Sequence, residues 1–142
     1  MAKRKYQVAV ILINYNSSRY TLDCVNSIFT RTSSDLHFQI VVIDNDSRPD
    51  DHYQLKVLQS KEHIQVFRSK INIGFSGANM MGVQLANADY YYFLNNDCLL
   101  IDDCLEKLYS FLEQHPQVAN CSGEMFDAAL EYSRNFGYFP SL

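Results

Sequence analysis

The chain has 142 residues, of which 47% are apolar. This is enough to build a packed core, and it excludes a disordered tail. The net charge is −4, with acidic and basic residues interspersed, so we do not expect binding to nucleic acid. The apolar run 8–13 is too short for a signal-peptide core with its cleavage site or for a bilayer. We therefore predict no transmembrane segment and a cytoplasmic location.

Two smaller features bear on location. Residues 3–5 are basic, which predicts a solvated end; peripheral membrane association is the alternative, although it usually needs a longer polybasic cluster. The four cysteines are Cys24, Cys98, Cys104 and Cys121, and they form neither a CxxC pair nor a zinc-site spacing. Free thiols in a reducing compartment are expected.

Short β-branched runs alternate with helical patterns along the chain. The first strand is nearly all apolar, which predicts burial on both faces. Ser17 or Ser18 is expected to cap the helix that follows, and Asp102 or Asp103 to start the last one. Strands are predicted at 8–13, 38–43, 64–67, 90–94 and 118–122, and helices after Ser18, at 51–60, at 75–86 and after Asp103.

This alternation predicts an α/β fold, in which a mainly parallel sheet is sandwiched by helices. No repeat, linker or low-complexity segment interrupts it, so residues 1–142 are interpreted as one domain. The tyrosines at 90–92 lie inside a strand and are expected to alternate between core and surface. The last segment, from Glu124, is rich in aromatic and polar residues and receives no assignment.

Three predicted strands end in clusters of asparagine and aspartate, at 14–16, 44–47 and 95–97. Ligands of open α/β sheets bind outside the carboxyl ends of the strands. Turn formation explains any single cluster, because both residue types favour turns. Three clusters at one edge favour a ligand site, in which we expect Asp44 and Asp97 to face a common cleft.

The chemistry of these side chains suggests roles. Asp44 is able to accept the imide N–H of a uracil or thymine ring, and Asn14 and Asn16 are able to meet the flanking carbonyls. Asp97 is the anionic candidate for a divalent cation, which prefers oxygen ligands and offsets charge on a leaving diphosphate. Asn95 is expected to contact a ribose or to hold Asp97 by hydrogen bonding.

The loop 72–79 opens a predicted helix and contains two glycines. It is not a GxGxxG motif, so by itself it is a weak signal. One interpretation is a helix start with small residues; the other is a loop that shapes a nucleotide-sugar pocket, with Asn79 bonding into it. Arg68 ends the third strand, where it either meets a phosphate or base or is simply solvated.

Four blocks together resemble the family 2 glycosyltransferases, which have the GT-A fold. They are 10–16 (VILINYN), 41–47 (VVIDNDS), 72–79 (NIGFSGAN) and 92–97 (YFLNND), in the family's order, and the resemblance covers about residues 6–125. The LNND block is most similar to the rhamnosyltransferase-like members, where others have DxD. Residues 126–142 are then the incomplete start of the acceptor-side region.

The resemblance implies a UDP- or dTDP-linked sugar donor, Mg²⁺ or Mn²⁺, and inverting transfer to a glycan or lipid-linked acceptor in cell-surface polysaccharide synthesis. It implies that Asp44 binds the base and that Asp97, the last residue of the DxD-like block, binds the metal. The predicted nucleotide-binding set is Asn14, Asn16, Asp44, Asn45, Ser47, Arg68, Asn72, Gly74, Asn79, Asn95 and Asn96.

Two departures from the family pattern matter. Asn95 replaces the first acid of DxD, so metal binding rests on one carboxylate. The family's catalytic base lies well downstream of DxD, and neither Asp127 nor Glu131 stands in a motif typical of it. We therefore expect the base beyond Leu142 and a chain that binds donor but transfers sugar poorly.

The alternatives are a non-catalytic nucleotide- or glycan-binding module and a nucleotidyltransferase, which would need a glycine-rich phosphate loop after the first strand.

Overall fold

The computed structural model describes residues 5–133. They fall into two compact units that divide after Glu106, where the sequence suggests one domain, and each unit is described by itself. The first unit is built on a four-stranded sheet in the order β3-β2-β1-β4, and all of its pairings are parallel. The strands are β1 (Tyr6–Asn14), β2 (Phe38–Asn45), β3 (Ile64–Ser69) and β4 (Ala88–Leu94).

Helices connect these strands, as parallel pairing requires. They are α1 (Ser18–Arg31), α2 (Pro49–Gln54), the 3₁₀ helix η1 (Leu55–Ser60) and α3 (Gly74–Leu85). The helix α4 (Cys104–Gln114) follows the last strand of this sheet, and the division between the units falls within it. The predicted α/β class and parallel sheet are confirmed. The helix predicted at 51–60 is α2 followed by η1, and Leu55 and Leu58 are buried as expected.

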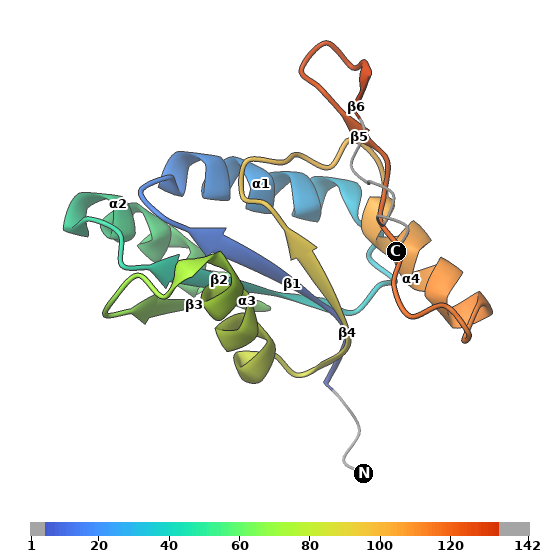
Figure 1. Ribbon diagram of the computed structural model, residues 1–142, viewed down its shortest axis with the longest axis horizontal. Coiled ribbons are helices and arrows are strands. Elements are labelled where there is room, and N and C mark those ends of the chain that lie inside the picture. Colours follow the sequence, from blue (N-terminus) through green and yellow to red (C-terminus); the bar gives the residue numbers. More distant parts are fainter. Residues whose placement is uncertain (1–4, 134–142) are drawn as a thin grey trace, which may run out of the picture. The chain divides into compact units, whose positions relative to one another are not determined.

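The two faces of the sheet carry different helices. Ala9, Ile11, Val41 and Ile43 pack with Ala78 of α3 in one core cluster. Because side chains alternate along a strand, the residues between them face the other way, where α1 contacts β1 and η1 contacts β3. Figure 1 shows α3 in front of the strands, and the arrows of β1 and β4 pointing the same way.

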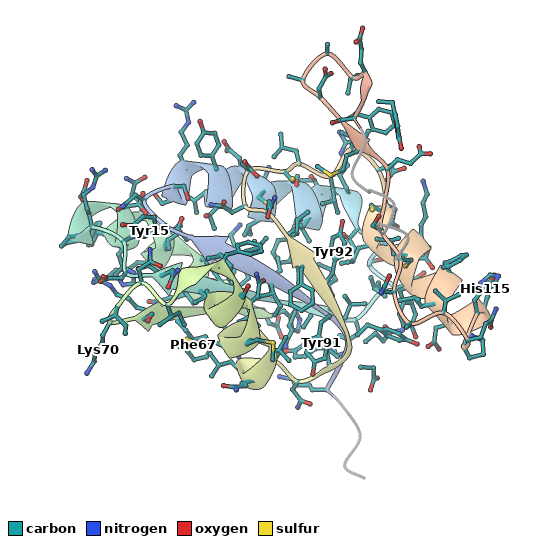
Figure 2. All side chains as sticks on the ribbon, viewed as in Figure 1. Tyr15, Phe67, Lys70, Tyr91, Tyr92 and His115 are labelled. Carbon is teal, nitrogen blue, oxygen red and sulfur yellow. The ribbon has the colours of Figure 1, made fainter. Side chains whose placement is uncertain are left out.

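The tyrosines of β4 follow this alternation, as expected. Tyr91 packs against the α3-side cluster, whereas the hydroxyl of Tyr92 lies 3.9 Å from the Cys104 sulfur (Figure 2). Burial raises the pKa of Tyr92 most, and the neighbouring Cys104 raises it further. These two side chains are therefore packing elements of the fold.

The prediction of a strand at 118–122 is wrong. After α4, the Val118 amide donates to the His115 carbonyl at 2.8 Å and closes a turn, and residues 115–124 are irregular. In the second unit a short antiparallel pair follows instead, β5 (Met125–Phe126) with β6 (Tyr132–Ser133). The Asp127 carboxylate accepts the amides of Ala129 and Glu131 at 2.9 and 3.0 Å, so it closes that hairpin.

Close packing of α3 on β1 depends on Gly82, and we predict that Gly82→Ala destabilises the chain by about 2 kcal/mol. A Cβ there would lie 2.5 Å from Ile11 Cγ2, and Ile11 is fully buried in the central strand. The overlap outweighs the gain of about 1 kcal/mol in helix propensity. Urea unfolding measures the difference.

Gly77→Ala is the matched control on the same helix. Its Cβ would meet Ile73 at 3.4 Å, and Ile73 is partly exposed and able to yield. We expect this variant to be as stable as the parent or slightly more so. Equal losses for the two variants would contradict the packing argument.

Candidate functional site

The carboxyl ends of β1, β2 and β4 meet at one edge of the sheet. The registers pair Asn14 with Asp44, and Leu12 with Leu94, so the segments after all three strands emerge together. At this edge lies a hollow of about 360 Å³. It lies in the place where open α/β sheets bind ligands.

The lining of the hollow is rich in amides. Five of the residues singled out from the sequence contribute to it: Asn45, Asn72, Asn95, Asn96 and Asp97. The other lining residues are Ile13, Tyr15, Ser17, Phe75 and Leu94. Asp97 is the lining carboxylate, and among the described residues no lysine or arginine lines the hollow.

One wall of the hollow is a loop held by two asparagines. The side-chain Nδ2 of Asn45 donates to Asn72 Oδ1 at 3.0 Å, and Asn45 Oδ1 accepts a hydrogen bond from the backbone N–H of Ile73 at 3.0 Å. Asn72 Oδ1 also accepts the amide of Gly74 at 2.9 Å. Gly74 has a φ of +73°, a conformation suited to glycine. These bonds fix the backbone where α3 begins, beside Phe75.

Asn14 is fully buried and does not line the hollow. Its amide donates to Asp51 Oδ1 at 2.8 Å, to Ser47 Oγ at 3.0 Å and to Asp44 Oδ1 at 3.3 Å. Its carbonyl oxygen accepts the Thr21 hydroxyl at 2.8 Å. Asn14 thus joins β1, α1 and the segment after β2, and its polar atoms are used inside the protein.

Asp44 is also fully buried, so it does not share the hollow with Asp97. Its Oδ2 lies 2.6 Å from His52 Nδ1 and 3.5 Å from Arg68 Nε, although neither contact is aligned as a hydrogen bond. Arg68 also donates to the Ser47 carbonyl at 2.8 Å. The two residues expected to meet a nucleotide base and phosphate therefore contact each other.

Asn16 and Ser47 tie two loops together. The Ser47 hydroxyl accepts a hydrogen bond from the backbone N–H of Asn16 at 2.9 Å. The side-chain Oδ1 of Asn16 accepts one from the backbone N–H of Arg48 at 2.8 Å. Asn16 and Asp46 adopt positive φ values of 52° and 68°, which asparagine and aspartate tolerate best after glycine. Asn79 lies outside the hollow, and its amide donates to the Phe75 carbonyl within α3 at 3.1 Å.

Sequence reasoning missed residues that complete this edge. Tyr15 and Phe75 line the hollow with 52% and 61% exposure, and Figure 2 labels Tyr15 beside the end of β1. Ser17 occupies the cap position of α1 but makes no side-chain cap bond; instead Asp51 Oδ2 accepts the Ser18 amide at 3.0 Å. Exposed aromatic residues next to a polar strand end were the available signal for Tyr15 and Phe75.

Asp51 gives a prediction for pH dependence. Burial raises the pKa of this carboxyl, but hydrogen bonds from Asn14, Ser18 and Ser47 outweigh it, so the net pKa lies below the ordinary 3.8. Since the folded-state pKa is depressed, the stabilisation is present above about pH 4 and is lost as pH falls through the folded value. We expect Asp51→Asn to cost about 2 kcal/mol at pH 7.

Urea unfolding of the parent and of Asp51→Asn from pH 7 to pH 3 measures this effect. The difference in the free energy of unfolding between the parent and Asp51→Asn should shrink below about pH 4. Asp50→Asn, at the exposed neighbouring position, serves as the control and should have little effect at any pH. A constant Asp51→Asn difference over the whole range would count against the carboxylate network.

The oxygen donors of the hollow fit a hard divalent cation. Mg²⁺ and Mn²⁺ bound with a diphosphate need only one or two protein oxygens. Asp97 is exposed in the hollow, and among the described residues no cation pairs with it. Burial, together with the neighbouring Asp97 charge, raises the pKa of the Cys98 thiol. No cluster of three or more His, Cys, Asp or Glu suited to a metal exists in residues 5–133, so a diphosphate and water would have to complete the coordination.

Comparison with known proteins adds two kinds of finding. Residues 9–132 match the model of "Glycosyl transferase family 2". An "Uncharacterized glycosyltransferase" of Rickettsia bellii is 29% identical over 79% of this chain and 16% of its own length. The "Minor teichoic acid biosynthesis protein GgaB" of Bacillus subtilis is 28% identical over 78% of this chain and 12% of its own length. The chain thus spans less than a fifth of the length of each of these relatives.

The fold agrees with a solved structure, that of S. aureus TarS residues 1–349 in complex with UDP-GlcNAc. The TM-score is 0.67 at 21% identity, over 78% of this chain and 32% of TarS 1–349. That likeness shows the GT-A fold expected from the sequence. Within residues 5–133, no helix has both the length and the apolar character to cross a membrane. The family match over most of its length shows that this chain belongs to glycosyltransferase family 2.

Proposed function

We propose that the hollow at the ends of β1, β2 and β4 binds the nucleotide diphosphate of a sugar donor, with a divalent cation held by Asp97. The observation that carries this is the lining itself, a carboxylate among amides with no cationic side chain from the described residues. A diphosphate placed there needs a bound cation to offset its charge. Mg²⁺ or Mn²⁺ would act as a Lewis acid toward the leaving diphosphate.

Side chains around the hollow supply the rest of a nucleotide site. The exposed rings of Tyr15 and Phe75 offer flat apolar surfaces for a base. Asn95 is exposed and lines the same hollow as Asp97, so its amide would be available to a ribose. The first turn of α3 begins at the loop of Asn72, and a helix N-terminus favours negative charge.

The buried residues have a supporting role in this proposal. Asn14, Asp44 and Ser47 hold the strand ends, and Asn16 and Arg68 hold the loop after β2. Base recognition by Asp44 stays a prediction, and it would require His52 or Arg68 to move from its carboxylate. Asn79 and Gly74 shape the start of α3.

The comparisons support a proposal for the donor class. TarS is solved with UDP-GlcNAc, and GgaB is named for teichoic acid biosynthesis. We propose a UDP-sugar as donor and a cell-surface glycan or its lipid-linked precursor as acceptor, with inversion at the anomeric carbon. The resemblance of residues 94–97 to rhamnosyltransferase-like members makes a dTDP-sugar the second donor to examine. The catalytic base is unassigned, and the cytoplasmic location stays a prediction.

Calorimetry tests this proposal. The chain is titrated with UDP, dTDP and GDP, each with and without Mn²⁺. We expect binding of UDP or dTDP that depends on the cation. No binding of any nucleotide at millimolar concentration would contradict the proposal. Transfer or hydrolysis of labelled UDP-GlcNAc then separates an enzyme from a binding module of the same fold.

A further inference from the structure

The turn that carries Asp97 is connected to the buried network by hydroxyl groups of the α1 region. Asn96 Nδ2 donates to Ser17 Oγ at 2.7 Å and to Thr21 Oγ1 at 2.9 Å. Thr21 in turn donates to Asn14 Oδ1 at 2.8 Å. Asn14 then bonds to the segment after β2. A continuous chain of hydrogen bonds therefore runs from the β4 turn to the β2 side of the site.

Thr21 is the buried link in this chain. It is fully inaccessible, in contrast to the partly exposed Ser17, which bonds only weakly to Asn14 at 3.5 Å. A hydroxyl accepts and donates at the same time, and Thr21 uses both capacities, since it accepts from Asn96 and donates to Asn14. Removing it would leave the fully buried Asn14 Oδ1 with only the long contact from Ser17, and Asn96 with only its bond to Ser17.

Further contacts hold the turn or the segment just after it. After the turn, the Leu100 amide donates to Ser27 Oγ of α1 at 3.0 Å. The backbone of the turn closes through the Cys98 amide, which donates to the Asn95 carbonyl at 3.1 Å. The Cys24 sulfur lies 3.9 Å from the same carbonyl, a weak contact. Asn95 and Asp97 themselves are exposed. The Cys98 sulfur contacts Asp97 Oδ1 at 3.9 Å, which is also weak. The position of the turn therefore depends in large part on how Asn96 is held.

We propose that Thr21 is a positioning residue of the donor site, which fixes the Asn95–Asp97 turn through Asn96 and couples it to Asn14. This inference rests on the proposed function for its consequence, a placed metal ligand. Its structural part stands on the hydrogen bonds alone. Thr21 lies on a helix face without any motif, so sequence reasoning had no reason to select it.

The test compares Thr21→Val with Thr21→Ser in the whole chain. Valine keeps the shape and removes the hydroxyl, whereas serine keeps the hydroxyl. Hydrogen exchange by NMR follows the Cys98 amide. We expect its protection to fall about tenfold in the valine variant and to stay within about twofold in the serine variant. Amides in the centre of β1 and β2 should keep their protection in both.

The matched control is Thr30→Val on the same helix. Thr30 is exposed, and its hydroxyl donates to the carbonyls of Asn26 and Ser27 in its own helix. This variant should leave Cys98 unchanged. Unchanged Cys98 protection in Thr21→Val, or equal losses in the serine variant, would overturn the inference. If Thr21→Val does not fold, Asn96→Ala removes the bonds to both Thr21 and Ser17. Cys98 protection should then fall at least about tenfold, and unchanged protection would overturn the inference.

A binding arm separates this inference from the proposed function. In calorimetry with UDP and Mn²⁺, Thr21→Val should bind at least about fivefold more weakly than the parent, and Thr21→Ser within about twofold. Equal affinity of the valine variant and the parent would overturn the positioning role. If the parent binds no nucleotide, the proposed function fails, and the exchange comparison still decides for or against Thr21.

Discussion

Asp97→Asn is expected to remove the dependence of UDP binding on Mn²⁺ and to weaken binding in its presence about 10- to 100-fold. Asparagine keeps the size of the side chain but loses the charge that a hard cation requires. A charge-assisted contact is worth about 1.5–3 kcal/mol, which corresponds to that range of affinity. Since Asp97 is exposed in the hollow, the variant should fold as well as the parent.

Calorimetry with UDP at fixed Mn²⁺ measures this change. Asp89→Asn is the control, because Asp89 is an exposed carboxylate near the opposite end of the same strand, β4. It removes the same charge from the chain and should bind UDP as the parent does. Equal weakening by the two variants would mean that only the net charge matters, and the assignment of Asp97 would then be wrong.

Asp44→Ala is expected to have the largest effect on stability, about 3 kcal/mol. The carboxylate is fully buried and accepts from Asn14 and from the amide of Ser47. Its other oxygen lies beside His52 and Arg68. Removing the carboxylate takes one partner from the Asn14 side chain and from the Ser47 backbone N–H, and it takes the nearby negative charge from Arg68.

Urea unfolding at pH 7 gives the free energy for Asp44→Ala. Asp46→Asn is the control two residues on, because Asp46 is exposed and asparagine tolerates its positive φ. We expect the control to lie within about 0.5 kcal/mol of the parent. Loss of uridine binding by Asp44→Asn in a chain of near-parent stability would instead support direct base recognition by Asp44.

The fold was predictable because its signals are local. Val8–Ile13 is a continuous apolar run, and the strand it predicts is the buried centre of a parallel sheet. Alternation of strand and helix then determines which ends share an edge. The exception at 118–122 shows the limit, since a segment becomes a strand only where a neighbouring strand pairs with it.

The site was predictable in position but not in detail. The strand-end clusters correctly indicated the edge where the hollow lies, and Asn45, Asn72, Asn95, Asn96 and Asp97 line it. A sequence does not show which polar side chain points outward. Asp44 and Asn14 are turned into the protein, where their partners are Thr21, Asp51 and His52, residues that no local motif marks. Long-range pairing decides such orientations.

The central claim is that the strand ends of β1, β2 and β4 bind a metal–nucleotide complex, and paramagnetic NMR tests it most directly. Mn²⁺ added with UDP to the ¹⁵N-labelled chain broadens amides near the ion. We predict selective broadening of the amides of Asn95, Asn96 and Asp97 and of Asn72, which lines the same hollow, reversed by EDTA. Broadening confined to other surfaces, or none at saturating UDP, would contradict the account.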